Sequence, residues 1–152
     1  MNDPTTGAQV RRSSVPPLIV TQDNAFWFEG VRQGKLLIQR CGDCGALRQP
    51  PGPVCPDCRS FHWDTIESSR RGTLHSYTVV HRPQDSAFTY PLAVGLLDLD
   101  EGTRIVADIG GTDPAELTIG MAMEVVFTEH AHGEVLPRLR PVSPTFQEGR
   151  TP

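Results

Sequence analysis

The second half of the chain has the pattern of hydrophobic and polar residues that is typical of β-strands. Residues 72–82 are rich in Thr, Tyr and Val, 91–99 form a nearly continuous apolar run, and 123–130 alternate between apolar and polar residues. Residues 103–109 and 135–142 complete a set of five segments of similar length. Alternation with a period of two and enrichment in β-branched residues indicate strands, so the pattern predicts five of them.

The residues between these segments predict how the strands are connected. Asp100, Glu101 and Gly102 form a hairpin turn between the second and third strands, and Gly95 inside the second strand predicts a bulge or sharp bend. Asp113 followed by Pro114 predicts a capped helical turn between the third and fourth strands. This number of strands and this position of the helix favour a five-stranded OB-fold barrel in a mainly β protein.

The segment before the strands predicts a short helix. Either Asp23 or Asn24 can cap a helix of about ten residues, and Gly34 would end it. Its first turn contains the consecutive aromatic residues Phe26, Trp27 and Phe28. Three consecutive aromatic side chains cannot all face one way, so one of them is a candidate for binding a partner. The alternative, which is somewhat more frequent, is that they pack on the domain with one side chain partly exposed.

All four cysteines lie within twenty residues, as two Cys-x-x-Cys pairs: Cys41 with Cys44 and Cys55 with Cys58. Two pairs at this spacing supply four sulfur ligands to a tetrahedral ion, and four thiolates leave no open coordination position. The sequence therefore predicts a structural zinc ribbon, with iron, two disulfides or a redox pair as the alternatives. We expect these cysteines to stabilise the fold and not to react.

Composition and charge exclude several classes of function. The chain has 152 residues and a formal net charge of −4, whereas proteins that bind nucleic acids through phosphate are usually basic. No apolar stretch is long enough to span a membrane, and the N-terminal residues lack the shape of a signal peptide. We therefore expect a cytoplasmic protein that binds neither nucleic acid nor a membrane.

The same patterns divide the chain into four parts. Residues 1–22 are predicted to be a flexible N-terminal tail, and residues 144–152 a C-terminal tail. Between them, residues 23–63 contain the predicted helix and zinc ribbon, and residues 64–143 contain the predicted barrel.

The order of these motifs resembles a known family. The stretches "FWFEGVRQGKLLIQRC", "LRQPPGPVCPDC", "GTLHSYTVVHRP", "LLDLDEGTRIVADIGG", "IGMAMEVVF" and "LPRLRPV" are similar to the acyl-CoA-associated OB-fold proteins that carry an N-terminal rubredoxin-like zinc ribbon, called domain of unknown function thirty-five. The resemblance runs from Asn24 to Val142 and covers most of the chain. One departure is His75, a position that is often aromatic in the family.

The resemblance implies an accessory or scaffold subunit of a thiolase-like acyl-CoA enzyme. Such a partner would be a homodimer that carries the catalytic residues, giving a heterotetramer with acyl-CoA at the shared site. The implied chemistry is that of a carbon–carbon lyase (aldolase) or an acyltransferase, with degradation of a steroid side chain as the leading substrate class. The chain itself then needs no catalytic residue.

The candidate substrate-binding residues lie in or beside the predicted loop 83–90. Phe88 and Tyr90 are expected to make apolar contacts near the acyl-CoA entrance, and Arg82 is a candidate for contacting CoA phosphates. The alternatives are a stand-alone acyl-CoA binding protein that uses Arg82 or Arg138, and, with less support, an OB module for single-stranded nucleic acid.

The titratable residues do not form an obvious active site of their own. His75 and His81 fall on one face of the first strand by parity, roughly 20 Å apart, too far to share a metal ion or a proton. His130 and His132 flank a hairpin tip, where we expect them to be solvated.

Overall fold

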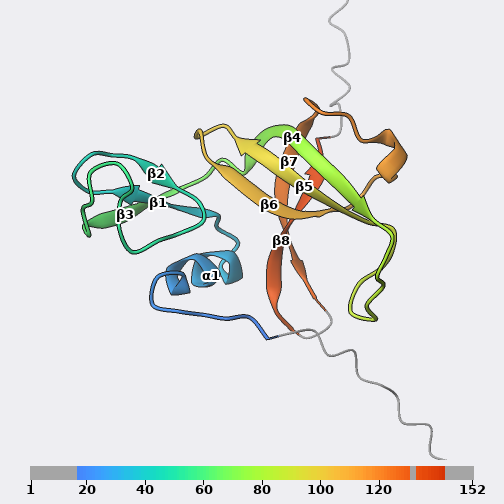
Figure 1. Ribbon diagram of the computed structural model, residues 1–152, viewed down its shortest axis with the longest axis horizontal. Coiled ribbons are helices and arrows are strands. Elements are labelled where there is room, and N and C mark those ends of the chain that lie inside the picture. Colours follow the sequence, from blue (N-terminus) through green and yellow to red (C-terminus); the bar gives the residue numbers. More distant parts are fainter. Residues whose placement is uncertain (1–16, 131–132, 143–152) are drawn as a thin grey trace, which may run out of the picture.

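The computed structural model describes residues 17–130 and 133–142. The predicted C-terminal tail, most of the predicted N-terminal tail and His132 lie outside the described residues. Figure 1 shows a small sheet beside a larger barrel, with a helix below the space between them. The described part is mainly β, as the sequence predicts.

The helix α1 (Ala25–Arg32) begins and ends where the sequence predicts. Gly34 takes a φ of 74° just beyond its C-terminal end, a conformation that favours glycine. Asn24 occupies the N-cap position, but its side chain does not cap the helix. The side-chain oxygen of Asn24 instead accepts a hydrogen bond from the Thr21 amide at 2.7 Å, and its amide group donates to the Ile19 carbonyl at 3.1 Å.

The small sheet consists of β1 (Leu37–Cys41), β2 (Leu47–Arg48) and β3 (Trp63–Glu67), in the antiparallel order β2-β1-β3. The apolar run KLLIQRC at residues 35–41 predicts a strand, which is β1, but no such pattern predicts β2 and β3. β2 has only two residues, and the side chains of β3 are all exposed or half-buried. Neither strand therefore shows a clear alternation of buried and exposed positions.

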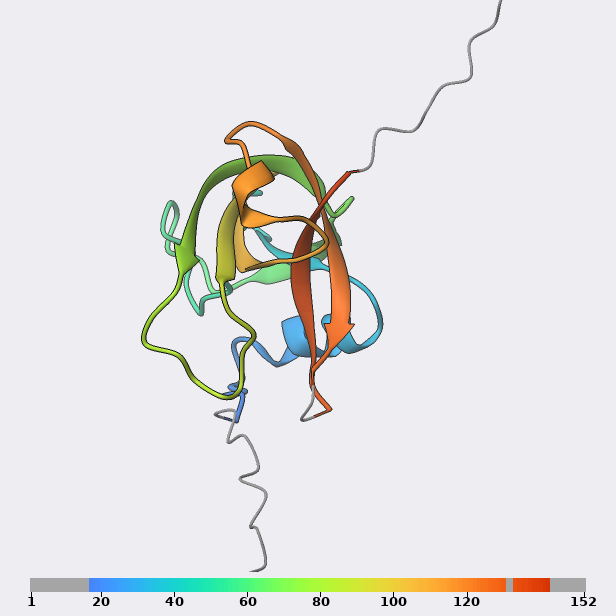
Figure 2. The same cartoon turned by 90° about the vertical axis from the view of Figure 1, so that its right-hand side faces the viewer.

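The barrel has the five strands and the helical turn that the sequence predicts. They are β4 (Arg71–Val80), β5 (Leu92–Leu99), β6 (Arg104–Ile109), the 3-10 turn η1 (Pro114–Glu116), β7 (Ala122–Glu129) and β8 (Val135–Pro141). The strands close in the order β4-β5-β6-β8-β7, with β6 and β8 parallel and β7 paired back to β4. Figure 2 looks along this closed ring, with η1 at one end and α1 below it.

One hydrophobic core joins the barrel to the small sheet. Leu74, Leu97 and Leu139 point into the barrel and are fully buried. Leu36 and Ile38, from the segment that leads into and forms β1, belong to the same cluster. The two parts therefore share buried apolar surface, which stabilises their relative position.

Two details of the first barrel strands differ from the sequence prediction. The irregular pairing lies in β4, between Leu74 and Ser76, and not at Gly95 in β5. Gly95 is instead a site of close packing, since a Cβ there would lie 2.8 Å from Ile109 and 3.0 Å from Leu139. Because the irregularity shifts the alternation of β4, the parity argument for the two histidines is wrong. Moreover, His81 lies beyond the end of β4.

Hydrogen bonds to the β5–β6 turn fix the linker between β3 and β4. The Glu101 carboxylate accepts hydrogen bonds from the Ser68 hydroxyl at 2.9 Å and from the Ser69 amide at 2.6 Å. The Ser68 oxygen in turn accepts from the Arg70 amide at 2.9 Å. One carboxylate therefore holds the point where the small sheet meets the barrel.

Replacing Glu101 with Gln is expected to destabilise the protein by about 1 kcal/mol at pH 7, because charge-assisted hydrogen bonds are lost. Burial alone would raise the pKa of Glu101, but the hydrogen bonds from Ser69 and Ser68 outweigh it and hold the pKa below its usual value. A lowered pKa gives stability that is present above the pKa of the unfolded chain and is lost as the pH falls through the folded value.

Urea unfolding of both proteins between pH 7 and pH 3 measures this effect. We expect the difference in unfolding free energy between wild type and Glu101→Gln to shrink as the pH falls below about 4.5. Glu129→Gln, a change at an exposed residue, is the matched control and should cost little at any pH. An equal loss for Glu101→Gln at pH 3 and pH 7 would refute the role of this carboxylate.

Candidate metal centre and apolar groove

The four cysteine sulfur atoms form one compact cluster at the end of the small sheet. All four Sγ atoms lie within 4.8 Å of one another. Cys41 and Cys58 are 3.5 Å apart, and Cys44 and Cys55 are 3.6 Å apart. A disulfide would need about 2.05 Å, whereas four sulfurs around a tetrahedral zinc ion at about 2.3 Å stand about 3.8 Å apart. The geometry therefore fits zinc, as predicted from the spacing, and not disulfides.

Both cysteine pairs sit on turns of the same design. The Gly45 amide donates to the Cys41 carbonyl at 3.0 Å, and the Arg59 amide donates to the Cys55 carbonyl at 2.9 Å. The residue after the second cysteine of each pair has a positive φ, 76° at Gly45 and 62° at Arg59. This repeated turn aims the two sulfurs of each pair at one point, which is the arrangement a zinc ribbon needs.

The electrostatics of the cluster favour a bound cation. Backbone amides of Cys44 and Asp43 lower the pKa of the Cys41 thiol to about 6. The Ser60 amide likewise lowers the pKa of the Cys58 thiol. Interactions with Cys41 and Cys44 outweigh this effect and raise the pKa of Cys58 to about 12. The Cys41 thiol therefore loses its proton easily, whereas ionisation of Cys58 is opposed by the negative charge of thiolates that have already formed. A bound divalent ion removes that opposition, and its four sulfur ligands leave no position for substrate or water.

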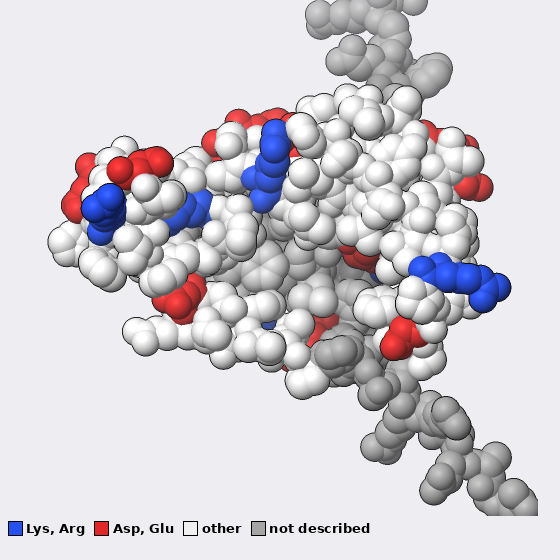
Figure 3. Space-filling model, viewed as in Figure 1, with Lys and Arg blue, Asp and Glu red and all other residues white. Residues whose placement is uncertain are grey.

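A second feature is a cavity of about 910 Å³ between α1, the loop after β4 and one side of the barrel. We call it the apolar groove. Its walls include Trp27 and Phe28 from α1, Phe88 from the loop, Val106 from β6 and Leu136 from β8. Figure 3 shows this face hollowed between the helix and the barrel, with mainly uncharged residues around the hollow.

The groove brings together residues from two separate sequence predictions. The candidates for partner binding, Trp27 and Phe28, and the candidate for acyl contact, Phe88, line the same cavity. Phe88 remains 45% exposed although it belongs to the wall. Trp27 packs against the core, and its buried indole N–H has no hydrogen-bond partner among the described residues.

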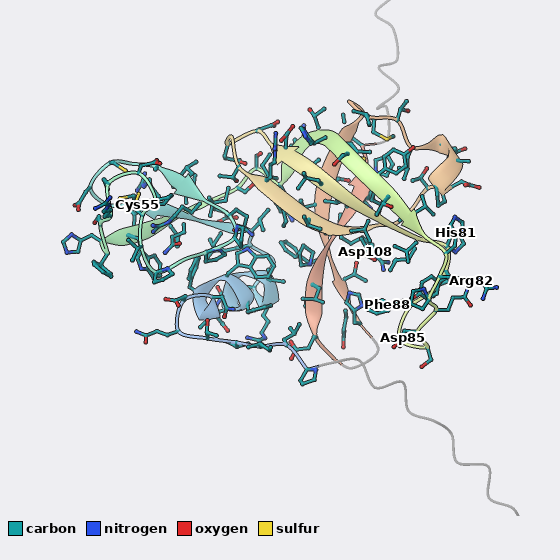
Figure 4. All side chains as sticks on the ribbon, in the orientation of Figure 1. Cys55, His81, Arg82, Asp85, Phe88 and Asp108 are labelled. Carbon is teal, nitrogen blue, oxygen red and sulfur yellow. The ribbon has the colours of Figure 1, made fainter. Side chains whose placement is uncertain are left out.

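Three other candidate residues lie elsewhere. Phe26 packs against Trp63 of β3, with ring centroids 4.8 Å apart, so it braces α1 on the small sheet. The Tyr90 hydroxyl accepts a hydrogen bond from the Asp85 amide at 3.1 Å and folds the loop on itself. Arg82 is exposed and lies on the outer side of the loop, whereas Phe88 points toward Asp108 (Figure 4).

The sequence does not indicate that two polar residues of the groove, Asp108 and Arg138, form an ion pair. The Arg138 Nε donates to the Asp108 carboxylate at 2.8 Å, across the parallel pairing of β6 and β8. His130 is half-buried in the groove wall, so the expectation that it is solvated is wrong. The nonlocal pairing that joins Asp108 to Arg138 has no local signal in the sequence.

The basic residues do not form one uncompensated surface. Arg138 pairs with Asp108, and the Arg140 Nε donates to Glu124 at 2.8 Å. Arg70 lies over the ring of Phe127, 5.8 Å from its centroid. Paired charges attract a phosphate backbone weakly, so this arrangement gives little support to nucleic-acid binding. Within the described residues, no helix has the length and apolar character needed to cross a membrane.

Two family models match adjacent parts of the chain. Residues 28–64 match the rubredoxin-like zinc ribbon domain of ChsH2, and residues 65–128 match the C-terminal OB-fold domain of ChsH2. Together they span the small sheet and most of the barrel.

Several curated proteins are similar to this chain over most of its length. The "Probable enoyl-CoA hydratase alpha subunit" of Thermomonospora curvata is 45% identical over 85% of the chain and 40% of its own length. The "3-oxo-4,17-pregnadiene-20-carboxyl-CoA hydratase alpha subunit" of Mycobacterium tuberculosis is 37% identical over 72% of the chain and 35% of its own length. The chain thus spans well under half of these two relatives.

Other relatives are closer to this chain in length. The "Benzoylsuccinyl-CoA thiolase subunit BbsA" of Thauera aromatica is 35% identical over 53% of the chain and 60% of its own length.

Among solved structures, a chain of the "Ltp2-ChsH2(DUF35) aldolase" superposes with a TM-score of 0.79 and is 45% identical. The match covers 82% of this chain and 98% of that one.

Proposed function

This chain belongs to the DUF35 family of ChsH2-type zinc-ribbon and OB-fold proteins, and on that premise we propose that it is an accessory subunit of an acyl-CoA enzyme. The observation that carries the proposal is the apolar groove, whose aromatic walls come from α1 and the loop after β4. The subunit binds a thiolase-like partner at this groove and shapes the acyl-CoA site there, while the partner carries catalysis.

The character of the groove supports a binding role rather than catalysis by this chain. Among the described residues of its wall, Asp108 is paired with Arg138, so neither group is available as a free acid or base. The cysteine cluster provides four ligands and no open coordination position. Large apolar walls with exposed aromatic residues are typical of surfaces that a partner or ligand covers.

The partner is proposed to be a thiolase-like homodimer that binds one copy of this chain on each protomer. The names of the relatives support this kind of partner, since one is a thiolase subunit and another belongs to an aldolase complex. A two-fold partner presents two equivalent surfaces, which gives a heterotetramer. The chemistry is carbon–carbon bond cleavage or formation on a CoA thioester, with a steroid side chain as the leading substrate class, in the cytoplasm.

Replacing Phe88 or Trp27 with Ala is expected to weaken the complex with this partner by more than about 1 kcal/mol, because buried aromatic residues dominate interfaces. Phe88 is the cleaner test, since it is outside the core cluster, whereas Trp27 packs against it. Calorimetric titration of the partner into each variant measures the effect. Zinc content should stay unchanged in both variants.

Ile119→Ala is the matched control for these variants. Ile119 is 68% exposed, lies between η1 and β7 and does not line the groove. The control should bind the partner as the wild type does. If Phe88→Ala and Trp27→Ala also bind like the wild type, the groove is not the partner surface.

A second candidate function is a stand-alone acyl-CoA binding protein. The volume of the groove, about 910 Å³, lies within the usual range for small-molecule sites. Calorimetry of the isolated chain with an acyl-CoA separates the two functions. Binding in the micromolar range or tighter without any partner favours the stand-alone protein, and binding only in the complex favours the accessory subunit.

A further inference from the structure

A second cleft, of about 650 Å³, lies between the zinc ribbon and the β5–β6 end of the barrel. In Figure 1 this end of the barrel faces the small sheet. One wall comes from Arg48, the last residue of β2, and from the prolines and glycine that follow it. The opposite wall comes from Leu99, Gly102, Thr103 and Arg104.

Arg48 stands out among the basic residues of the protein. Its side chain is in the wall of the cleft, yet only 8% of the residue is exposed. All three guanidinium nitrogens are buried. None of them has a hydrogen-bond partner among the described residues, which include the four cysteines. Other arginines nearby are paired, for example Arg40, whose Nε donates to Asp64 at 2.8 Å.

An unpaired guanidinium in this position is energetically costly. Arginine remains charged at any physiological pH, so it cannot escape burial by losing its proton. A buried charge without a partner is strongly unfavourable, and natural proteins normally supply an anion or a hydrogen-bond acceptor. Asp98, an acid that lines the cleft, does not fill this role, because it is already bound by Arg104 at 2.5 Å and by His75 at 2.8 Å.

A second donor faces the same cleft. The Thr103 hydroxyl is buried and also has no hydrogen-bond partner among the described residues. A guanidinium fork and a hydroxyl are donors that match the oxygens of a carboxylate or a phosphate. The side-chain oxygen of Gln49, which also lines the cleft, is buried and has no hydrogen-bond partner among the described residues.

We propose that this cleft is a binding site for a small oxyanion, a phosphate or a carboxylate group, whose oxygens accept hydrogen bonds from Arg48 and Thr103. The uncompensated charge of Arg48 supplies the affinity, and Thr103 helps to orient the group. The cleft is larger than either group alone, so the oxyanion can be one end of a larger small molecule. The site is separate from the apolar groove, since the two share no wall residue.

Titration of the zinc-loaded, 15N-labelled chain tests the proposal. Inorganic phosphate and acetate are added in separate experiments at an ionic strength held constant with sodium chloride. We expect saturable shifts of the amide signals of Arg48, Thr103 and their neighbours with at least one of the anions. Shifts with phosphate alone assign a phosphate group, shifts with acetate alone assign a carboxylate, and shifts with both assign the shared chemistry.

Three variants link the shifts to the proposed donors. Arg48→Met should weaken binding at least tenfold, which is the effect expected from losing about one charge-assisted hydrogen bond. Thr103→Val should weaken binding about fivefold. Arg71→Met removes an equal charge from an exposed residue that forms no ion pair with the described residues, and should bind as the wild type does. Because Arg48→Met removes an unpaired buried charge, we expect it to remain folded.

Two results would overturn the proposal. One is that neither anion gives saturable shifts at the cleft of the wild-type chain. The other is that Arg48→Met, or Thr103→Val if the first variant fails to fold, binds the anion as tightly as the wild type.

Discussion

Replacing Cys44 with Ser is expected to abolish zinc binding and to unfold the ribbon, with a loss on the order of 10 kcal/mol in the free energy of metal-coupled folding. The four sulfurs lie within 4.8 Å of one another, and removing one leaves three thiolates around the ion. The ribbon has only three short strands, so little else holds its turns. Since Leu36 and Ile38 belong to the core shared with the barrel, the barrel loses stability as well.

Metal analysis and amide spectra measure this outcome. The wild type should contain about one zinc ion per chain, as four-cysteine sites do, and iron in its place would correct the choice of metal. Cys44→Ser should lose the metal and the dispersed signals of residues 36–63. Val54→Ser is the matched control, because Val54 lies next to Cys55 but is 36% exposed and is not a ligand. A stable, fully folded protein without metal would contradict a structural role for the site.

Replacing Gly72 with Ala is expected to destabilise the barrel by about 3 kcal/mol. Gly72 is buried in β4 where this strand pairs with both β5 and β7 and so closes the barrel. A Cβ at this position would lie 2.1 Å from the backbone oxygen of Asp98 and 2.9 Å from its carbonyl carbon. Backbone atoms in a closed sheet cannot move aside as a flexible side chain can, so the strands must separate.

Urea unfolding of Gly72→Ala beside Gly52→Ala isolates this effect. Gly52 lies in the ribbon, and a Cβ there would meet no atom within 4 Å, so its replacement should cost well under 1 kcal/mol. A loss of less than about 1 kcal/mol for Gly72→Ala would show that β4 and β5 are packed less closely than the structure indicates.

The features that the sequence predicts well are those that depend on neighbouring residues. The metal site follows from two Cys-x-x-Cys pairs, because each pair is one local turn. The barrel follows from five segments of strand-like composition and from the capped turn at Asp113, whose side chain accepts a hydrogen bond from the Ala115 amide at 2.8 Å. Patterns of this kind depend on neighbouring residues, so the packing of distant segments does not change what they predict.

The features that the sequence does not predict arise from contacts between distant segments. Trp27, Phe88 and Arg138 meet in one groove although they come from a helix, a loop and the last strand. The irregular pairing in β4 lies at His75, where no glycine or proline marks it, whereas Gly95 serves close packing instead. The cleft at Arg48 is formed together with residues of the barrel, so the sequence neighbours of Arg48 give no indication of it.

We propose that this chain is a subunit that binds its thiolase-like partner at the apolar groove. Co-expression with a candidate thiolase-like partner, followed by size-exclusion chromatography and an acyl-CoA lyase assay, tests this subunit role. We expect a heterotetramer that is active as a complex, with an interface of more than about 1,000 Å². A thiolase-like protein that is soluble and fully active alone, and that never co-elutes with this chain, would contradict it.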